Sequence, residues 1–251
     1  MTFQALLLSL LAASLTHATH LGKRAALDTC LQQSDIPTDT LGSTAWKADV
    51  LPYNARLPYA PVAVAVPTTI AQVQASVNCG RSAAIKTNPK CRGHSYASLG
   101  LGGDDGHFII QLDNIYNVTL DTTTNIATIQ AGARLGHVAN SLWTQGKRAI
   151  SAGTCPGVGV SGHAIHGGYG MSSHKHGLAV DAKAARTVVL ANGTITNCSA
   201  TQNSDLFWAL RGAGSNFGVV VPYEFTTFAP PSTVTYFNMN FKWNINNASA
   251  N

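Results

Sequence analysis

Residues 153–170 read GTCPGVGVSGHAIHGGYG, and this stretch decides how the rest of the chain is interpreted. Its eighteen positions hold seven glycines, two histidines and one cysteine, Cys155. Glycine-rich backbone presents several N–H groups to one point, and such concavities bind anions such as a diphosphate. We therefore predict that this glycine-rich loop (residues 153–170) holds a phosphorylated ligand and carries a nucleophilic thiol.

Two other kinds of site match parts of the same stretch. Gly157, Gly159 and Gly162 satisfy the G-x-G-x-x-G dinucleotide pattern, but the residues after Gly162 show no helical periodicity, so we expect no Rossmann helix. Four histidines lie between residues 163 and 176, without an acidic residue or a second cysteine among them. We therefore expect no metal site.

A second loop of similar composition lies earlier in the chain. Residues 90–106 read KCRGHSYASLGLGGDDG and are called the GHS loop below. This loop carries a second nucleophile, His94. Two glycine-rich loops, each with a nucleophilic side chain, indicate a large phosphorylated cofactor held by backbone groups and by covalent bonds.

The apolar pattern around these loops predicts an α+β fold. A strand, a helix and a second strand within thirty residues suggest a parallel β-α-β unit. The strands are expected at 61–67 and 83–87, and the helix between them has Thr68 as its cap and Ile70, Val73 and Val77 on its apolar face. The other expected strands are 108–114, a hairpin of 117–121 with 126–132, a hairpin of 187–190 with 194–196, and 219–228. The other expected helices are 135–146, ended by Gly146, and 204–212, capped by Ser204.

Composition and the N-terminus indicate a secreted globular protein. Of the 251 residues 45% are hydrophobic and 11% are charged, which is a globular balance. The net charge of +5 is scattered, so we expect no nucleic-acid binding. The apolar run from Ala5 to Leu15 predicts a signal peptide over residues 1–18 and is too short to span a membrane. We expect residues 19–58 to be irregular and the protein to be extracellular, without membrane association.

The cysteines and sequons agree with secretion. The chain has five cysteines, so at least one stays outside any disulfide. Cys30 and Cys79 can close a loop of about fifty residues, worth roughly 4 kcal/mol in the chain-entropy model. The four N-x-[ST] sequons, at which we expect glycosylation, are Asn117, Asn192, Asn197 and Asn247.

Four sequence blocks carry a resemblance to a known family. They are GHSYASLGLGGDDGH (93–107), GARLGHVA (132–139), residues 149–181, and QNSDLFWALRGAGSNFG (202–218). Together they resemble the PCMH-type FAD-binding domain of vanillyl-alcohol-oxidase-type flavoproteins. Within these, the chain is most similar to fungal oligosaccharide oxidases and berberine-bridge-like enzymes.

The resemblance implies a domain of two α/β subdomains over residues 59–230, followed at 231–251 by the first strand of a largely missing substrate-binding sheet domain. It implies that His94 bonds to the 8α carbon of FAD and Cys155 to C6, with Tyr96 on the substrate side and the general base outside this chain. The other residues expected to bind FAD are Gly93, Ser95, Gly153, Gly159, Ser161, Gly162, His163, Gly167, Gly168, Gly170, Gly218, Val219 and Val220.

The activity that the resemblance implies is oxidation of the reducing-end C1–OH of an oligosaccharide by a monomer, with dioxygen as acceptor and a lactone and H2O2 as products. Two alternatives remain open: an oxidase of a secondary metabolite, and an inactive secreted relic. Four departures bear on this choice. Arg92 stands where the family usually has a glycine next to the cofactor, and Cys91 beside it is also unusual. Lys183 and Arg186 stand at positions that are commonly apolar in the family.

Overall fold

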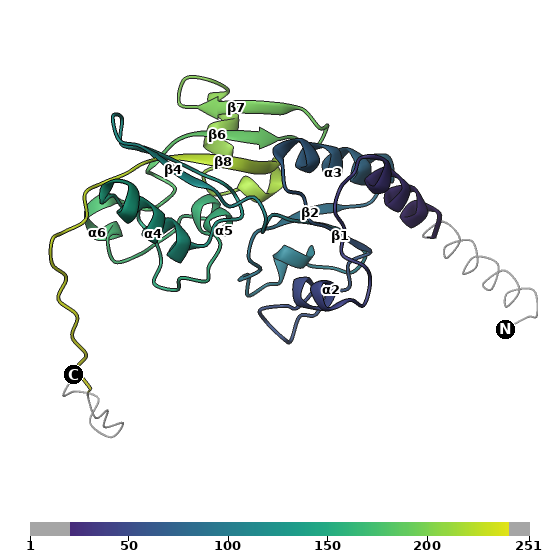
Figure 1. Ribbon diagram of the computed structural model, residues 1–251, viewed down its shortest axis with the longest axis horizontal. Coiled ribbons are helices and arrows are strands. Elements are labelled where there is room, and N and C mark those ends of the chain that lie inside the picture. The colour runs from purple at the N-terminus through teal and green to yellow at the C-terminus, as the bar shows by residue number, and fades with distance from the viewer. Residues whose placement is uncertain (1–20, 241–251) are drawn as a thin grey trace, which may run out of the picture.

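The computed structural model describes residues 21–240, drawn in colour in Figure 1. The predicted signal peptide and Asn247 lie outside these residues. Two sheets and their helices form a mixed α/β body, and residues 229–240 run away from it at the C-terminal end (Figure 1). None of the helices within the described residues is both long and apolar enough to cross a membrane.

The segment predicted to be irregular contains two helices. Residues 21–33 are helical, and α2 spans Thr44–Asp49. Leu27 and Leu31, one turn apart in the first of these helices, are both buried in the main core. The prediction was wrong because Leu27 and Leu31 are the only large apolar residues that mark the buried face of this helix, which is a weak periodic signal.

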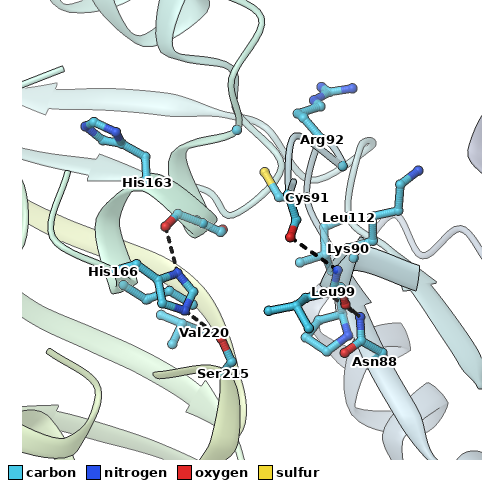
Figure 2. A pocket seen from close by; sticks show the side chains of 18 of the residues that line it. Asn88, Lys90, Cys91, Arg92, Leu99, Leu112, His163, His166, Ser215 and Val220 are labelled. Atoms are coloured by element: carbon cyan, nitrogen blue, oxygen red, sulfur yellow. Dashed lines mark hydrogen bonds between the residues drawn. The ribbon is translucent and has the colours of Figure 1, made fainter. Parts of the chain in front are cut away.

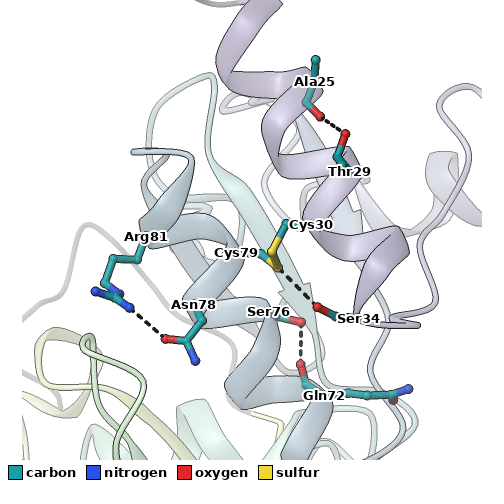
Figure 3. The surroundings of a disulfide bond; sticks show 9 residues. All are labelled: Ala25, Thr29, Cys30, Ser34, Gln72, Ser76, Asn78, Cys79 and Arg81. Atoms are coloured by element: carbon teal, nitrogen blue, oxygen red, sulfur yellow. Dashed lines mark hydrogen bonds between the residues drawn. A yellow bond between two sulfur atoms is a disulfide. The ribbon is translucent and has the colours of Figure 1, made fainter.

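A disulfide fastens the N-terminal helix to the body of the molecule, as predicted. Cys30 bonds to Cys79, which lies in α3 (Ile70–Ser82), with the two Cα atoms 5.6 Å apart. Figure 3 shows residues 21–33 lying beside α3 at this point. The bond closes a loop across 49 positions, and it thereby ties the first described helix to the first sheet unit.

The first sheet is parallel and has three strands. Its order is β1-β3-β2, from β1 (Ala63–Ala65), β3 (Phe108–Gln111) and β2 (Thr87–Lys90). The parallel β-α-β unit was therefore predicted correctly, but β2 lies at 87–90 and not at 83–87. Ala84 has a left-handed φ of 53°, which ends the α3 region and delays the strand. Thr69 caps α3 in place of Thr68, by accepting a hydrogen bond from the Gln72 N–H.

The second sheet is antiparallel, with the order β4-β5-β8-β6-β7. Both predicted hairpins are present, β4 with β5 and β6 with β7, and β8 lies at the centre between β5 and β6. The strands are β4 (Val118–Asp121), β5 (Ile126–Ile129), β6 (Lys183–Val189), β7 (Ile195–Ser199) and β8 (Val219–Thr226).

The helices of the second half differ from the predictions at their ends. The helix α4 (Leu135–Gly146) buries Leu135, Val138 and Leu142 as expected, but the left-handed residue that ends it is Lys147 and not Gly146. The helix α7 (Ser204–Ala209) has Asn203, not Ser204, as its N-cap. The remaining short helices are α5 (Val160–Ile165), α6 (Ser173–His176), η1 (Leu99–Leu101) and η2 (Gly214–Asn216).

The strand expected at the C-terminus is not formed within the described residues. Residues 231–240 have no regular structure, and Val234, Tyr236, Phe237 and Met239 are each more than 60% exposed. A strand needs a neighbouring strand to satisfy its backbone groups. The described part of the chain offers residues 231–240 no such neighbour.

Candidate functional site

A pocket of about 640 Å³ lies between the two sheet units (Figure 2). One wall comes from the end of β2 and the GHS loop, and includes Lys90, Cys91 and His94. The other wall comes from α5, η2 and the start of β8, and includes Ser161, His166 and Ser215. Residues of the GHS loop and of the glycine-rich loop therefore face one space, as predicted, together with Ser215, which lies more than a hundred positions from His94.

The GHS loop is anchored behind the pocket by Lys90. This buried ammonium group donates a 2.6 Å hydrogen bond to the Asp49 backbone oxygen and lies 3.8 Å from Asp49 Oδ1. Burial lowers the pKa of Lys90. Burial also raises the pKa of Asp49, as does a hydrogen bond with Asp39, and the pKa reaches about 6 although the positive charge of Lys90 acts in the opposite direction. Gly93 has a φ of +71°, and a Cβ atom there would lie 2.8 Å from Cε of Lys90. The loop therefore requires glycine at this position.

Arg92, one of the four departures from the family, is among the residues that line the pocket. Its side chain points away from the cavity (Figure 2). The Nε group donates a 2.8 Å hydrogen bond to the Gly132 oxygen, and a terminal nitrogen donates to the Asp113 oxygen at 3.3 Å. The guanidinium also forms an ion pair with the Asp113 carboxylate. Arg92 thus braces the GHS loop against two neighbouring turns.

Cys91 is a structural thiol in the wall of the pocket. Its Sγ donates a 2.9 Å hydrogen bond to the Ala131 oxygen. Burial raises the pKa of this thiol to about 11, so it stays protonated at neutral pH and is a poor nucleophile. Any side chain at Gly159 would collide with this sulfur, which explains the glycine at that position.

The opposite wall contains a helix that the sequence did not predict. The helix α5 begins at Val160 inside the glycine-rich loop, directly after Gly159. The expectation of no helix here was wrong because a helix of only six residues needs little apolar periodicity, and Val160 and Ala164 alone bury its inner face. The Ser161 hydroxyl donates a 2.6 Å hydrogen bond to the Ala131 oxygen, which is the same oxygen that Cys91 contacts.

The pocket histidines are fixed by backbone and hydroxyl groups. His166 places Nδ1 3.0 Å from the Gly162 oxygen and Nε2 2.9 Å from the Ser215 hydroxyl. In the neutral ring Nδ1 therefore carries the proton and Nε2 accepts from Ser215. His163 Nε2 lies 3.3 Å from the Ser151 oxygen. The described residues contain no group of three His, Cys, Asp or Glu side chains placed to hold a metal ion.

The two predicted nucleophile loops meet at one rim of the pocket. A Cβ atom at Gly157 would lie 3.5 Å from Nε2 of His94, so the loop that carries Cys155 passes against the imidazole. Tyr53, which no sequence motif indicated, stacks on the His94 ring at 4.6 Å between centroids. Cys155 and Tyr96 are exposed at this rim and are not among the pocket-lining residues.

The predicted cofactor residues divide into two groups. Ten line the pocket: Gly93, His94, Ser95, Gly159, Ser161, Gly162, His163, Gly218, Val219 and Val220. Gly153, Gly167, Gly168 and Gly170 do not line it. Gly167 and Gly168 have positive φ angles, and their carbonyls accept hydrogen bonds from Val180 and Ala179, so they shape the turn behind α5. Residues of the pocket that the sequence did not indicate include Asn88, Leu99, Ser215, Asn216 and Tyr223.

Residues 61–199 match the FAD binding domain family. The chain belongs to this family. It is 57% identical over 232 residues to a xylooligosaccharide oxidase from Thermothelomyces thermophilus, which covers 92% of this chain and 46% of the relative. It is 56% identical over 226 residues to a chitooligosaccharide oxidase from Gibberella zeae, which covers 90% of this chain and 46% of that relative. The chain thus spans about half the length of these relatives.

A solved structure supports the same family assignment. The glucooligosaccharide oxidase of Acremonium strictum, described with a 6-S-cysteinyl, 8α-N1-histidyl FAD, matches at 45% identity with a TM-score of 0.81. The match covers 82% of this chain and 43% of that one. The mixed α/β architecture and the family that the sequence predicted are therefore both confirmed.

Proposed function

We propose that this chain is the FAD-binding part of an oligosaccharide oxidase, with FAD attached to both His94 and Cys155. The observation that carries the proposal is the meeting of the two loops at one rim, where a Cβ atom at Gly157 would lie 3.5 Å from His94 Nε2. Carbon 8α, the methyl on C8, and C6 both belong to the benzenoid end of the flavin, on either side of C7, so two attachments there require two loops that converge.

The residues of the pocket fit a dinucleotide. A diphosphate requires backbone N–H groups that it can approach closely. Gly93 and Gly159 line opposite walls and carry no side chain, so a diphosphate could approach their backbone closely. The large side chain at position 92 points out of the cavity, so it leaves this approach open (Figure 2).

The proposed reaction is oxidation of the reducing-end C1–OH of an oligosaccharide to a lactone. Two electrons and two protons leave the sugar, and dioxygen receives them to give H2O2. When bound, FAD supplies this two-electron chemistry. His94 and Cys155 would hold it at the rim, and the exposed Tyr96 ring beside them would offer a flat surface to a sugar. The oligosaccharide class is supported by the xylo- and chitooligosaccharide oxidases that the chain resembles.

The test is to denature the 251-residue chain in acid and to measure whether flavin stays attached, by mass and by visible colour. We expect flavin to remain in the unmodified chain and in His94→Ala and Cys155→Ala separately, and to be lost when both are combined. His137→Ala, which changes an exposed histidine away from the pocket, is the matched control and should retain both attachments. A colourless precipitate from the unmodified chain, or colour in the combined variant, would contradict the proposal.

We propose further that the protein is secreted, glycosylated and monomeric. Secretion is supported by the Cys30–Cys79 disulfide, and glycosylation by the exposure of Asn117, Asn192 and Asn197. Treatment with an N-glycosidase should lower the mass of protein from a eukaryotic host, and light scattering should give the mass of one chain. An unchanged mass, or a dimer, would overturn the corresponding part of this proposal.

A further inference from the structure

Tyr53 makes an aromatic contact with the proposed attachment residue His94. The two rings stack with centroids 4.6 Å apart and an interplanar angle of 27°. Tyr53 is 50% exposed, so its ring is not part of the hydrophobic core. Packing in the core therefore does not account for the position of the Tyr53 ring, and its main aromatic contact is with His94.

The segment around Tyr53 is fastened to the GHS loop at more than one point. The Asn54 side-chain nitrogen donates a 2.8 Å hydrogen bond to the backbone oxygen of Tyr96, two residues after His94. The Tyr53 and Tyr96 rings also meet edge to face, with centroids 5.3 Å apart. The phenol consequently has a fixed position relative to the loop that carries His94.

The imidazole is bounded on a second side by the glycine-rich loop. A Cβ atom at Gly157 would lie 3.5 Å from His94 Nε2 and 3.8 Å from Cε1. With Tyr53 stacked on the ring and Gly157 beside it, rotation about the bond that carries the imidazole is restricted. A nucleophile held in one orientation reacts faster than one that samples several.

We propose that Tyr53 is a positioning residue for the covalent attachment of FAD to His94. This inference rests on the proposed function. In the attachment step a nitrogen of His94 bonds to the 8α carbon, and the imidazole proton and one 8α hydrogen leave as protons. The two electrons left behind enter the flavin ring, and dioxygen takes them with two protons to give H2O2. Tyr53 touches neither reacting bond and acts by holding the plane of the imidazole.

The Cys155 attachment provides an internal comparison. The thiol has no ring to orient, so the loss of a stacked aromatic should affect it little. In a Cys155→Ala background, acid-stable flavin reports attachment to His94 alone, and in a His94→Ala background it reports attachment to Cys155 alone. The two backgrounds therefore separate a local effect on His94 from a general effect on folding.

The experiment measures the initial rate of acid-stable flavin formation when each variant of the 251-residue chain is incubated with FAD in air. In the Cys155→Ala background, we expect Tyr53→Ala to lower the rate about fivefold, the scale of one aromatic pair. Tyr53→Phe, which keeps the ring, should restore the rate. In the His94→Ala background, Tyr53→Ala should leave the rate unchanged.

Tyr116→Ala is the matched control. Tyr116 is also about half exposed and also contacts a histidine ring, His137, at 5.6 Å, but His137 does not line the pocket, whereas His94 does. We expect it to change neither rate. Equal loss in both backgrounds, no loss in either, or failure of Tyr53→Phe to restore the rate would each overturn the role of Tyr53. If Cys155→Ala and His94→Ala hold no acid-stable flavin with Tyr53 intact, the proposed function itself fails.

Discussion

Arg186 is a buried cation whose hydrogen-bonding groups are not satisfied within the described residues. It is 1% exposed, and none of its three guanidinium nitrogens has a hydrogen-bond partner there. It lies over the Phe207 ring at 5.1 Å, and burial lowers its pKa to about 10. A charge without hydrogen bonds in a low-dielectric site destabilises the folded state. Strand β6 therefore carries a destabilising residue in its middle.

We predict that Arg186→Met raises the free energy of unfolding by about 2 kcal/mol at pH 7, because an apolar side chain of similar volume removes the desolvation cost. The pKa of Arg186 is lower in the folded than in the unfolded chain, so its penalty is present below about pH 10 and declines above it. The gain from Arg186→Met should follow the same pH range. Urea unfolding at pH 7 and pH 10.5 measures both.

The control is Arg211→Met. Arg211 also lies over Phe207, at 5.7 Å, but its side chain is 37% exposed and it is paired with Asp181. Exposed ion pairs contribute little, so we expect a change within about 0.5 kcal/mol. Equal changes in the free energy of unfolding for Arg186→Met and Arg211→Met would show that the burial of Arg186 does not cause the gain in stability.

At the scale of elements, the GHS loop depends on contacts made by its first residues. Arg92 joins the loop to the turns at Asp113 and Gly132 through two hydrogen bonds and one ion pair. We predict that Arg92→Gly lowers the free energy of unfolding by about 1–3 kcal/mol, because it leaves the partly buried Asp113 carboxylate without its cation. Chemical denaturation measures the loss.

Asp113→Asn tests the same contact from the other partner. If the ion pair carries the effect, Arg92→Gly should cost less in the Asp113→Asn background than in the unmodified chain. Additive losses in the free energy of unfolding would indicate that the two side chains act independently. An Arg92→Gly variant as stable as the unmodified chain would contradict the claim that Arg92 stabilises the GHS loop.

Local patterns predicted some elements and missed others for identifiable reasons. The helix α4 and the two hairpins were predictable because Leu135, Val138 and Leu142 recur at helical spacing and because apolar runs flank clear turns. Strand β2 was misplaced because a left-handed Ala84 separates it from the apolar residues before it. Helix α5 was missed because its burial depends on the surrounding sheets and not on its own periodicity.

At the scale of the whole molecule, the site could be predicted only as far as its motifs carried their own chemistry. His94 and Cys155 stood out because nucleophiles rarely occur in glycine-rich loops. Tyr53 and Ser215 did not, because nothing local to residue 53 or 215 indicates that the fold places them against His94 and His166. Such partners become visible only when the two sheet units are assembled.

The disulfide also acts at this scale. Cys30–Cys79 joins the N-terminal helix to α3, and its loss frees a loop of 49 positions in the unfolded chain. We predict that Cys30→Ala combined with Cys79→Ala lowers stability by about 4 kcal/mol. Guanidinium unfolding of both proteins, with and without reductant, measures this. The variant should be insensitive to reductant, and equal stability of the two oxidised proteins would contradict the prediction.

The central claim is that one cofactor joins two distant loops. The most direct measurement is proteolysis of the acid-denatured chain followed by mass spectrometry of the flavin-containing peptides. We predict one species in which the peptide with His94 and the peptide with Cys155 are joined through a single FAD. Unmodified His94 and Cys155 peptides with no flavin-containing species, or flavin on any other residue, would contradict the claim.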